Sequence, residues 1–165
     1  MIQETFIVIS LALGAYVVGS VPTAYILVRW MGREDIRDVG SRNVGALNAY
    51  NRTGAWAGLL VLFMDTAKGV LAVAAPRLLG VDPWVLFITT PLVVAGHNWP
   101  VFLNFRGGKG AAAIFGISLV IVPWLTIITA EPSILVMLLL RNVVLGATFG
   151  FILLNTLLWV TGQGA

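Results

Sequence analysis

The chain has 165 residues, of which 59% are hydrophobic and only 10% are charged, and its mean hydropathy is +0.96. Soluble globular domains carry about 25% charged residues, so this composition excludes one and predicts an integral membrane protein. The formal net charge is +3. Because the chain has no cysteine and only one histidine, disulfides, thiolate metal sites and histidine-rich metal sites are excluded, and we expect no metal and no cofactor.

The first predicted span covers residues 5–28, an uncharged run that exceeds the roughly 20 residues needed for one crossing. It lacks the basic n-region and the cleavage site of a secretory signal, so we expect it to be retained. Ala15, Gly19 and Thr23 are spaced four residues apart, which lets another helix approach closely. Pro22 is expected to kink the helix or thin its last turns, because proline has no backbone donor.

The longest polar stretch, residues 29–52, contains five of the ten basic residues. By the positive-inside rule, this excess places the loop in the cytoplasm and the N-terminus outside. Within the loop, the run GSRNVGALN at 40–48 suits a tight turn with exposed amides and short hydrogen-bonding side chains. A plain connecting loop is the alternative, but a loop of this length is more often functional.

The second predicted span, residues 56–75, contains two charges near its middle. Asp65 and Lys68 are three residues apart and so lie on one helix face, where they can neutralise each other. Either charge alone would cost several kcal/mol in lipid, so we expect both to face the bundle interior. A structural ion pair is the favoured interpretation, and direct contact with a substrate is the alternative.

After a short outer turn at residues 76–83, the third predicted span runs from Trp84 to about Leu103 and leads into the run FRGGKG at 105–110. Three glycines and a lysine directly before a helix combine backbone donors, a helix N-terminus and a cation, which favours a phosphate. The alternative is an ordinary loop whose basic residues only set topology. For His97, a hydrogen-bonded structural role is the more common one, and a role as general base remains open.

Three further apolar segments follow this loop, at residues 111–122, 125–140 and 142–160. The first two are separated by Pro123, and a Glu-Pro pair at 131–132 interrupts the second. If Lys109 and Arg141 share the cytoplasmic face, each arm between them is only about 23 Å long, short of a membrane core of about 30 Å. The pair of segments is then short or partly re-entrant, unless Arg141 snorkels from inside a longer span.

The six apolar segments predict an all-α fold, a polytopic transmembrane helical bundle of about six spans that forms a single transmembrane domain over residues 1–165. An even number of spans places both termini outside. The charged loops between the spans are the candidate functional regions.

Four stretches of the chain carry a family resemblance: GSVP at 19–22, GSRNVGALN at 40–48, DTAKG at 65–69 and GHNWPVFLNFRGGKG at 96–110. In order and spacing they resemble the motifs of the bacterial acyl-phosphate:glycerol-3-phosphate acyltransferases. A fifth stretch, LRNVVLG at 140–146, resembles a weakened form of that family's third motif. The resemblance covers about residues 12 to 150.

The resemblance implies a seven-span bundle in the cytoplasmic membrane. Its cytoplasmic loops would transfer an acyl chain from acyl phosphate to the 1-hydroxyl of glycerol 3-phosphate, giving lysophosphatidic acid and phosphate in phospholipid synthesis. The implied partners are these two substrates and membrane lipid, without nucleic acid. An acyl phosphate is already activated, so positioning of two anionic headgroups can supply much of the rate.

By resemblance, Ser41 and Lys109 hold the glycerol phosphate and are the candidate catalytic residues. The remaining candidates for substrate binding are Asn43, Gly45, Asn48, Arg52, His97, Gly107, Gly108, Gly110 and Arg141. Among them, Gly107, Gly108 and Gly110 match residues whose amides hold phosphate in the family. Asn43, Gly45 and Asn48 match the frame of the first motif that shapes the site.

The chain also departs from the family pattern. Arg42 and Leu47 stand where the family has a glycine and a threonine, and Val144 aligns with a serine. The substrate-binding arginine of the family aligns with Asn51, and Arg52 lies one place further. The charged C-terminal span of the family has no counterpart. The alternatives are therefore an inactive family member that binds lipid precursors or a partner, and a small anion transporter.

Overall fold

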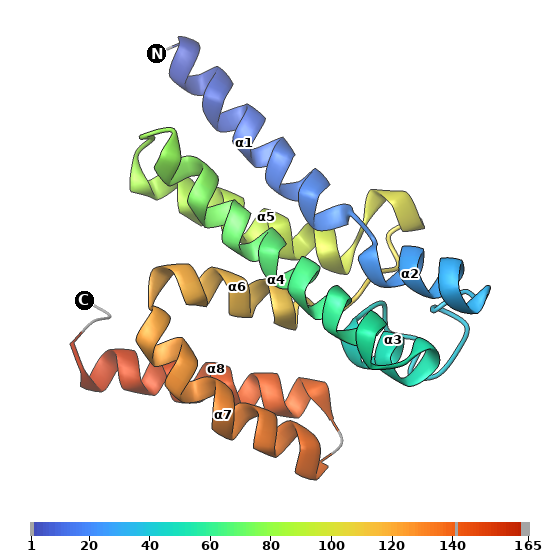
Figure 1. The fold of residues 1–165 in the computed structure, drawn as a ribbon. Coiled ribbons are helices and arrows are strands. Elements are labelled where there is room, and N and C mark those ends of the chain that lie inside the picture. The colour runs from blue at the N-terminus through green and yellow to red at the C-terminus, as the bar shows by residue number, and fades with distance from the viewer. Residues whose placement is uncertain (1, 141, 163–165) are drawn as a thin grey trace. The chain divides into compact units, whose positions relative to one another are not determined.

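The structure is a computed structural model that describes residues 2–140 and 142–162, and every regular element in these ranges is helical (Figure 1). The helices are α1 (Ile2–Ser20), α2 (Thr23–Gly32), α3 (Ala46–Thr53), α4 (Ala55–Leu78), the short η1 (Pro83–Val85), α5 (Leu86–Asn98), the short η2 (Val101–Leu103), α6 (Ala111–Ile121), α7 (Pro123–Leu140) and α8 (Val143–Val160). The all-α class predicted from the sequence is confirmed.

Five helical segments of the described chain are long and apolar enough to cross a membrane. They are Ile2–Gly32, Ala55–Leu78, Pro83–Leu103, Pro123–Leu140 and Val143–Val160. The other predicted segment forms α6, which has only 11 residues and spans about 17 Å at 1.5 Å per residue. Its shortness agrees with the expectation of a short or re-entrant segment directly after the glycine-rich loop.

The chain divides into two compact units, Met1–Ile117 and Ser118–Ala165. The first unit contains both loops that the sequence singles out, and α6 begins within it. The expectation of a single domain over residues 1–165 stays a prediction.

In the first unit, the sequence breaks the first predicted span in two. Helix α1 ends at Ser20 and α2 begins at Thr23, so the dipeptide Val21-Pro22 is non-helical. The Pro22 carbonyl accepts the first bond of α2, 3.0 Å from the amide of Ile26. The proline therefore ends one helix and starts the next, as its missing donor leads one to expect.

Small residues allow the helices of this unit to approach closely. A Cβ at Gly19 would overlap the carbonyl oxygen of Val93 on α5, and one at Gly96 would overlap the carbonyl oxygen of Tyr16 on α1. The close packing of α1 against α5 therefore requires glycine at both contacts, which is the packing expected of small residues in membrane helices.

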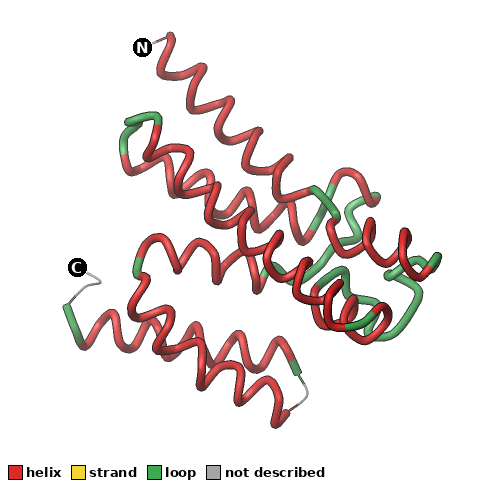
Figure 2. The backbone as a smooth tube through the Cα atoms, in the orientation of Figure 1, coloured by secondary structure: helices red, strands yellow, loops and turns green. Residues whose placement is uncertain are grey.

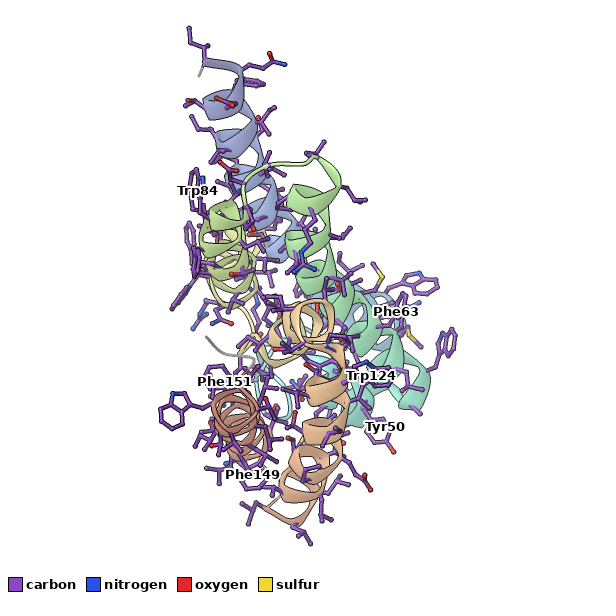
Figure 3. All side chains as sticks on the ribbon, turned by 90° about the vertical axis from the view of Figure 1, so that its left-hand side faces the viewer. Tyr50, Phe63, Trp84, Trp124, Phe149 and Phe151 are labelled. Atoms are coloured by element: carbon purple, nitrogen blue, oxygen red, sulfur yellow. The ribbon has the colours of Figure 1, made fainter. Side chains whose placement is uncertain are left out.

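The outer surface of the helices is apolar. In Figure 3, Phe63 on α4 and Trp84 on η1 point away from the helices, and 69% and 51% of their surfaces are exposed. Lipid tails solvate such side chains as well as a protein interior does, so this surface suits a membrane. The integral membrane class predicted from composition agrees with it.

The second unit packs α7 against α8. Gly146 lies against Met137, where a Cβ would come within 2.5 Å of the methionine Cβ. The side chain of Asn142 begins α8 by accepting from the amide of Val144 at 2.9 Å. The Glu-Pro pair at 131–132 interrupts only the apolar run, because α7 continues through Pro132. Arg141 lies outside the described residues, so its predicted role is without a structural description.

Candidate functional site

The two loops singled out by the sequence lie against each other in the first unit. A Cβ added at Gly108 would come within 2.6 Å of the carbonyl oxygen of Val44, so the backbones of the two loops are in contact. Arg37 adds a hydrogen bond from Nη1 to the carbonyl oxygen of Leu103 at 3.2 Å. Figure 2 shows both loops toward one end of the unit's helices, with the turn between α4 and η1 at the other end.

The first loop is organised around the buried side chain of Asn48. Its Nδ2 donates to the carbonyl oxygens of Ile36, Val39 and Asn43 at 3.0 to 3.1 Å. Its Oδ1 accepts from the amide of Ser41 at 3.2 Å. Asn48 therefore fixes the backbone of the first loop, including the amide of Ser41. The Ser41 side chain is exposed.

Three residues between α2 and α3, namely Arg33, Gly40 and Arg42, adopt left-handed backbone conformations. Gly40 has a φ of +58° and Arg42 has the same value. Only glycine takes this conformation without a steric penalty, so the backbone of Arg42 is strained. The family that the sequence resembles has a glycine at this position. The Arg42 side chain is exposed, on the loop that contacts Gly108.

The second loop folds back on the end of α5. The Gly107 amide donates to the carbonyl oxygen of Asn98 at 3.1 Å, and the Gly108 amide donates to the carbonyl oxygen of His97 at 3.0 Å. This corrects the expectation that the amides of Gly107 and Gly108 are free to hold phosphate, because both already have backbone acceptors. Gly110 has a φ of +74° and makes the turn into α6.

The backbone donors available in this loop therefore lie further along the chain. Helix α6 begins at Ala111, and the carbonyl oxygen of Gly110 accepts its first bond, from Ile114 at 2.9 Å. The first amides of a helix have no acceptor within it, and their dipoles favour an anion. The exposed Lys109 lies directly before them. The start of α6 thus combines backbone donors with a cation.

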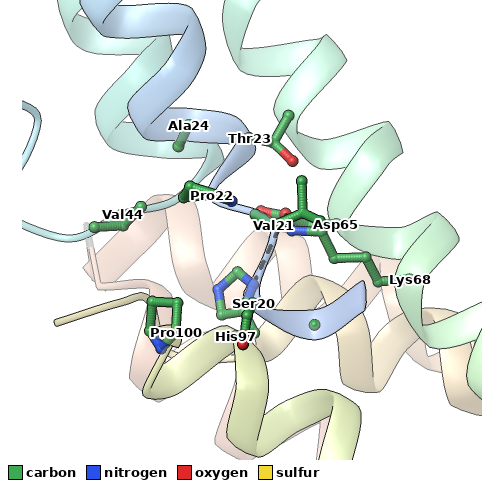
Figure 4. A pocket seen from close by; sticks show the side chains of 11 residues that line it. Ser20, Val21, Pro22, Thr23, Ala24, Val44, Asp65, Lys68, His97 and Pro100 are labelled. Carbon is green, nitrogen blue, oxygen red and sulfur yellow. Dashed lines mark hydrogen bonds and ion pairs between the residues drawn. The ribbon is translucent and has the colours of Figure 1, made fainter. Parts of the chain in front are cut away.

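A buried ionic cluster lies beside this loop (Figure 4). Lys68 Nζ lies 2.6 Å from Asp65 Oδ1 and also donates to the carbonyl oxygen of Val21 at 2.6 Å. His97 Nδ1 lies 3.8 Å from the same carboxylate oxygen. The ion pair expected from the i, i+3 spacing is present, and both charges are buried, as their cost in lipid requires.

The cluster includes polar groups at the α1–α2 break that sequence reasoning missed. Asp65, Lys68 and His97 line a cavity of about 10 Å³ together with residues 19–24 of the break. Thr23 Oγ1 is buried there without a hydrogen-bond partner among the described residues. Pro22 could have predicted these contacts from the sequence. A proline breaks the helix, and a backbone carbonyl at the break becomes available to a buried lysine.

Two arginines of the polar stretch at residues 29–52 form ion pairs. Arg52 binds Glu34 through two nitrogens, at 2.7 to 3.1 Å. Arg37 binds Asp35 at 2.6 Å, and this contact lowers the pKa of the Asp35 carboxyl and raises the pKa of the Arg37 guanidinium. A role for Arg52 in binding substrate stays a prediction, because Glu34 holds its guanidinium in this structure.

No group of three or more metal-ligating side chains occurs in the part of the chain that the structure describes. The features in that part are an all-helical membrane unit, a junction of two basic loops and a buried ionic cluster below it. They define an integral membrane protein with a site suited to phosphate groups.

Comparison with known proteins identifies the family. The family model described as glycerol-3-phosphate acyltransferase matches residues 9–164. The glycerol-3-phosphate acyltransferase of Thermoanaerobacter pseudethanolicus is 39% identical over 155 residues, which are 92% of this chain and 78% of that protein. The chain belongs to the glycerol-3-phosphate acyltransferase family.

Other relatives are longer. Glycerol-3-phosphate acyltransferase 5 of Dehalococcoides mccartyi is 41% identical over 119 residues, which are 72% of this chain and 51% of that protein. The chain thus spans about half the length of this curated relative. The crystal structure of PlsY, an integral membrane glycerol 3-phosphate acyltransferase in its glycerol 3-phosphate form, has a TM-score of 0.84 at 35% identity. The match covers 94% of this chain and 78% of PlsY.

Proposed function

We propose that this protein transfers an acyl chain from acyl phosphate to the 1-hydroxyl of glycerol 3-phosphate, giving lysophosphatidic acid and phosphate. The observation that carries the proposal is the junction of the two basic loops at Val44 and Gly108. It puts Ser41 and Lys109 on two segments that touch, as a site for two phosphate-bearing substrates requires. Crystal structures of PlsY in glycerol 3-phosphate and lysophosphatidic acid forms support the choice of substrate and product.

The reaction needs no strong nucleophile from the protein. The 1-hydroxyl oxygen attacks the acyl carbonyl carbon, the bond from that carbon to the phosphate oxygen breaks, and the departing phosphate takes the hydroxyl proton. The protein has to hold two anions together and stabilise charge on the phosphate. Ser41, Lys109 and the first amides of α6 are the groups proposed to hold the phosphate of glycerol 3-phosphate beside the acyl phosphate.

Asn43, Gly45 and Asn48 are proposed to shape this site from the first loop. Asn48 has the contacts for that role, since its side chain holds the backbone of residues 36 to 43. The acyl chain is proposed to lie among the apolar helices. We further propose that the protein lies in the cytoplasmic membrane with both loops on the cytoplasmic side, because the first loop concentrates the basic residues.

The test uses the purified full chain in lipid with acyl phosphate and glycerol 3-phosphate. Release of phosphate together with formation of lysophosphatidate is expected, and an acyl thioester as donor is expected to give neither. Lys109→Ala and Ser41→Ala should each lower the rate at least tenfold. Arg77→Ala, which removes one positive charge at the end of α4, serves as the matched control.

Binding of glycerol 3-phosphate without any lysophosphatidate would reject catalysis and leave the inactive, precursor-binding alternative. Normal activity of Lys109→Ala or Ser41→Ala would remove that residue from the site. Turnover with the thioester would reject the proposed donor but not the acylation of glycerol 3-phosphate.

A further inference from the structure

One short stretch of α4, residues 65–69, contacts the chain on both sides of the loop that precedes α6. Asp65 faces His97, which lies upstream of the loop, at 3.8 Å. Gly69 packs against Ala113, which lies downstream of it on α6. Residues 65 and 69 are four apart and therefore share one helix face. A single helical turn thus reaches both ends of residues 98–110.

The upstream contact passes through His97 to Gly108. The carbonyl oxygen of His97 accepts the Gly108 amide at 3.0 Å. The ring of the same histidine lies against Gly108, where a Cβ would overlap Nε2. Val44 lies on this glycine as well, with its carbonyl oxygen 2.6 Å from the position of a Cβ. Gly108 is therefore enclosed by His97 and the first loop, and movement of His97 would move it.

The downstream contact fixes the start of α6. A Cβ at Gly69 would overlap the carbonyl oxygen of Ala113 and come within 2.9 Å of the Ile117 amide nitrogen. On the facing side, a Cβ at Gly116 would overlap the carbonyl oxygen of Thr66. The two helix backbones touch without intervening side chains, so the first turn of α6 has no room to shift toward α4.

Lys68 completes the arrangement. Its Nζ neutralises Asp65 and donates to the carbonyl oxygen of Val21 at the α1–α2 break, which also accepts from the amide of Thr23. Without Lys68 the Asp65 carboxylate would be an unpaired charge in an apolar surrounding. The ion pair therefore holds the Asp65 carboxylate in place opposite His97.

We propose that residues 65–69 of α4 are positioning residues for the loop before α6, acting through His97 on one side and Ala113 on the other. They set where Lys109 and the first amides of α6 point, without contact to substrate. The effect on substrate rests on the proposed function, whereas the effect on loop geometry does not.

Hydrogen–deuterium exchange of the full chain in lipid, without substrate, tests the geometric part. Asp65→Asn keeps the shape of the side chain and removes its charge, and Gly69→Ala perturbs the other contact. Both are expected to raise amide exchange at least fivefold in residues 107–113 and less than twofold in the N-terminal half of α1. Thr90→Ala, on α5 and away from the loop, is the matched control and should change neither.

Steady-state kinetics supply the second readout. Both variants are expected to raise the KM for glycerol 3-phosphate at least fivefold and to leave the KM for acyl phosphate within twofold. Unchanged exchange at residues 107–113, or an increase spread evenly over the helices, would overturn the inference. If the unmodified protein forms no lysophosphatidate, the proposed function fails, and exchange alone still decides the positioning role.

Discussion

Replacing Gly108 by alanine is the most direct perturbation of the loop junction. The new methyl group would overlap His97 Nε2 and lie 2.6 Å from the carbonyl oxygen of Val44. The second of these groups is backbone, and the ring of the first is buried, so neither can rotate out of the way. The two loops must separate to make room.

The magnitude follows from this overlap. Inserting a methyl group into a closely packed site costs about 1–3 kcal/mol. If the cost falls on the loop junction that binds the phosphate, affinity for glycerol 3-phosphate drops about 5-fold to 150-fold. Gly14→Ala is the control, because nothing lies within 4 Å of its Cβ position on the exposed face of α1. That variant should bind as well as the unmodified protein.

Titration calorimetry of the lipid-embedded protein with glycerol 3-phosphate measures the effect directly. The thermal midpoint of each variant shows whether the fold is retained. Affinity within twofold of the unmodified protein for Gly108→Ala, with a retained fold, would refute the reasoning. The contact between Val44 and Gly108 would then not belong to the binding site.

Three further predictions concern the first loop. Arg52→Ala is expected to raise the KM for glycerol 3-phosphate, and Glu34→Gln to lower it by releasing Arg52; no change in either variant removes Arg52 from the site. Arg42→Gly should raise the thermal midpoint by about 2–4 °C, equivalent to about 1 kcal/mol, because glycine relieves the left-handed φ of +58°; a lower midpoint would contradict this. Asp35→Asn should lower the stability at pH 7 by about 0.5–1 kcal/mol. Because Arg37 lowers the pKa of folded Asp35, this contribution is present above the unfolded pKa and is lost as pH falls through the folded pKa. The thermal midpoints of the variant and the unmodified protein should therefore converge only below the ordinary Asp pKa of about 3.9.

The helices were predictable because each has a strong local cause. Apolar runs such as residues 56–75 have one stable structure in lipid, where every backbone group must be satisfied within the helix. The pairing of Asp65 with Lys68 followed from helical periodicity and the cost of a lone charge. Pro22 predicted a disturbed helix at the end of the first span, and the helix is broken there, between α1 and α2. Pro132 lies inside α7, within the single apolar segment predicted for residues 125–140.

The partners of the loop residues were not predictable in the same way. The bonds from Gly107 and Gly108 to α5 depend on how the chain turns back after Pro100, which no periodicity encodes. The pairing of Arg52 with Glu34 joins residues 18 positions apart across a folded loop. Local patterns give the chemistry of such residues, and only the tertiary fold decides which partner they meet.

The glycines of the second loop illustrate why composition alone gave an incomplete account of the site. Gly107 and Gly108 are required because the carbonyl oxygens of α5 and the His97 ring leave no room for a Cβ, and Gly110 is required by its positive φ. The glycines of this loop are therefore explained by close packing and backbone conformation. They affect phosphate binding only indirectly, through the position of the loop. The donors for an anion are the next amides along the chain, at the start of α6. It follows that a larger residue at Gly107 should displace the start of α6 and Lys109 with it. This displacement should account for the loss of affinity for glycerol 3-phosphate in such a variant.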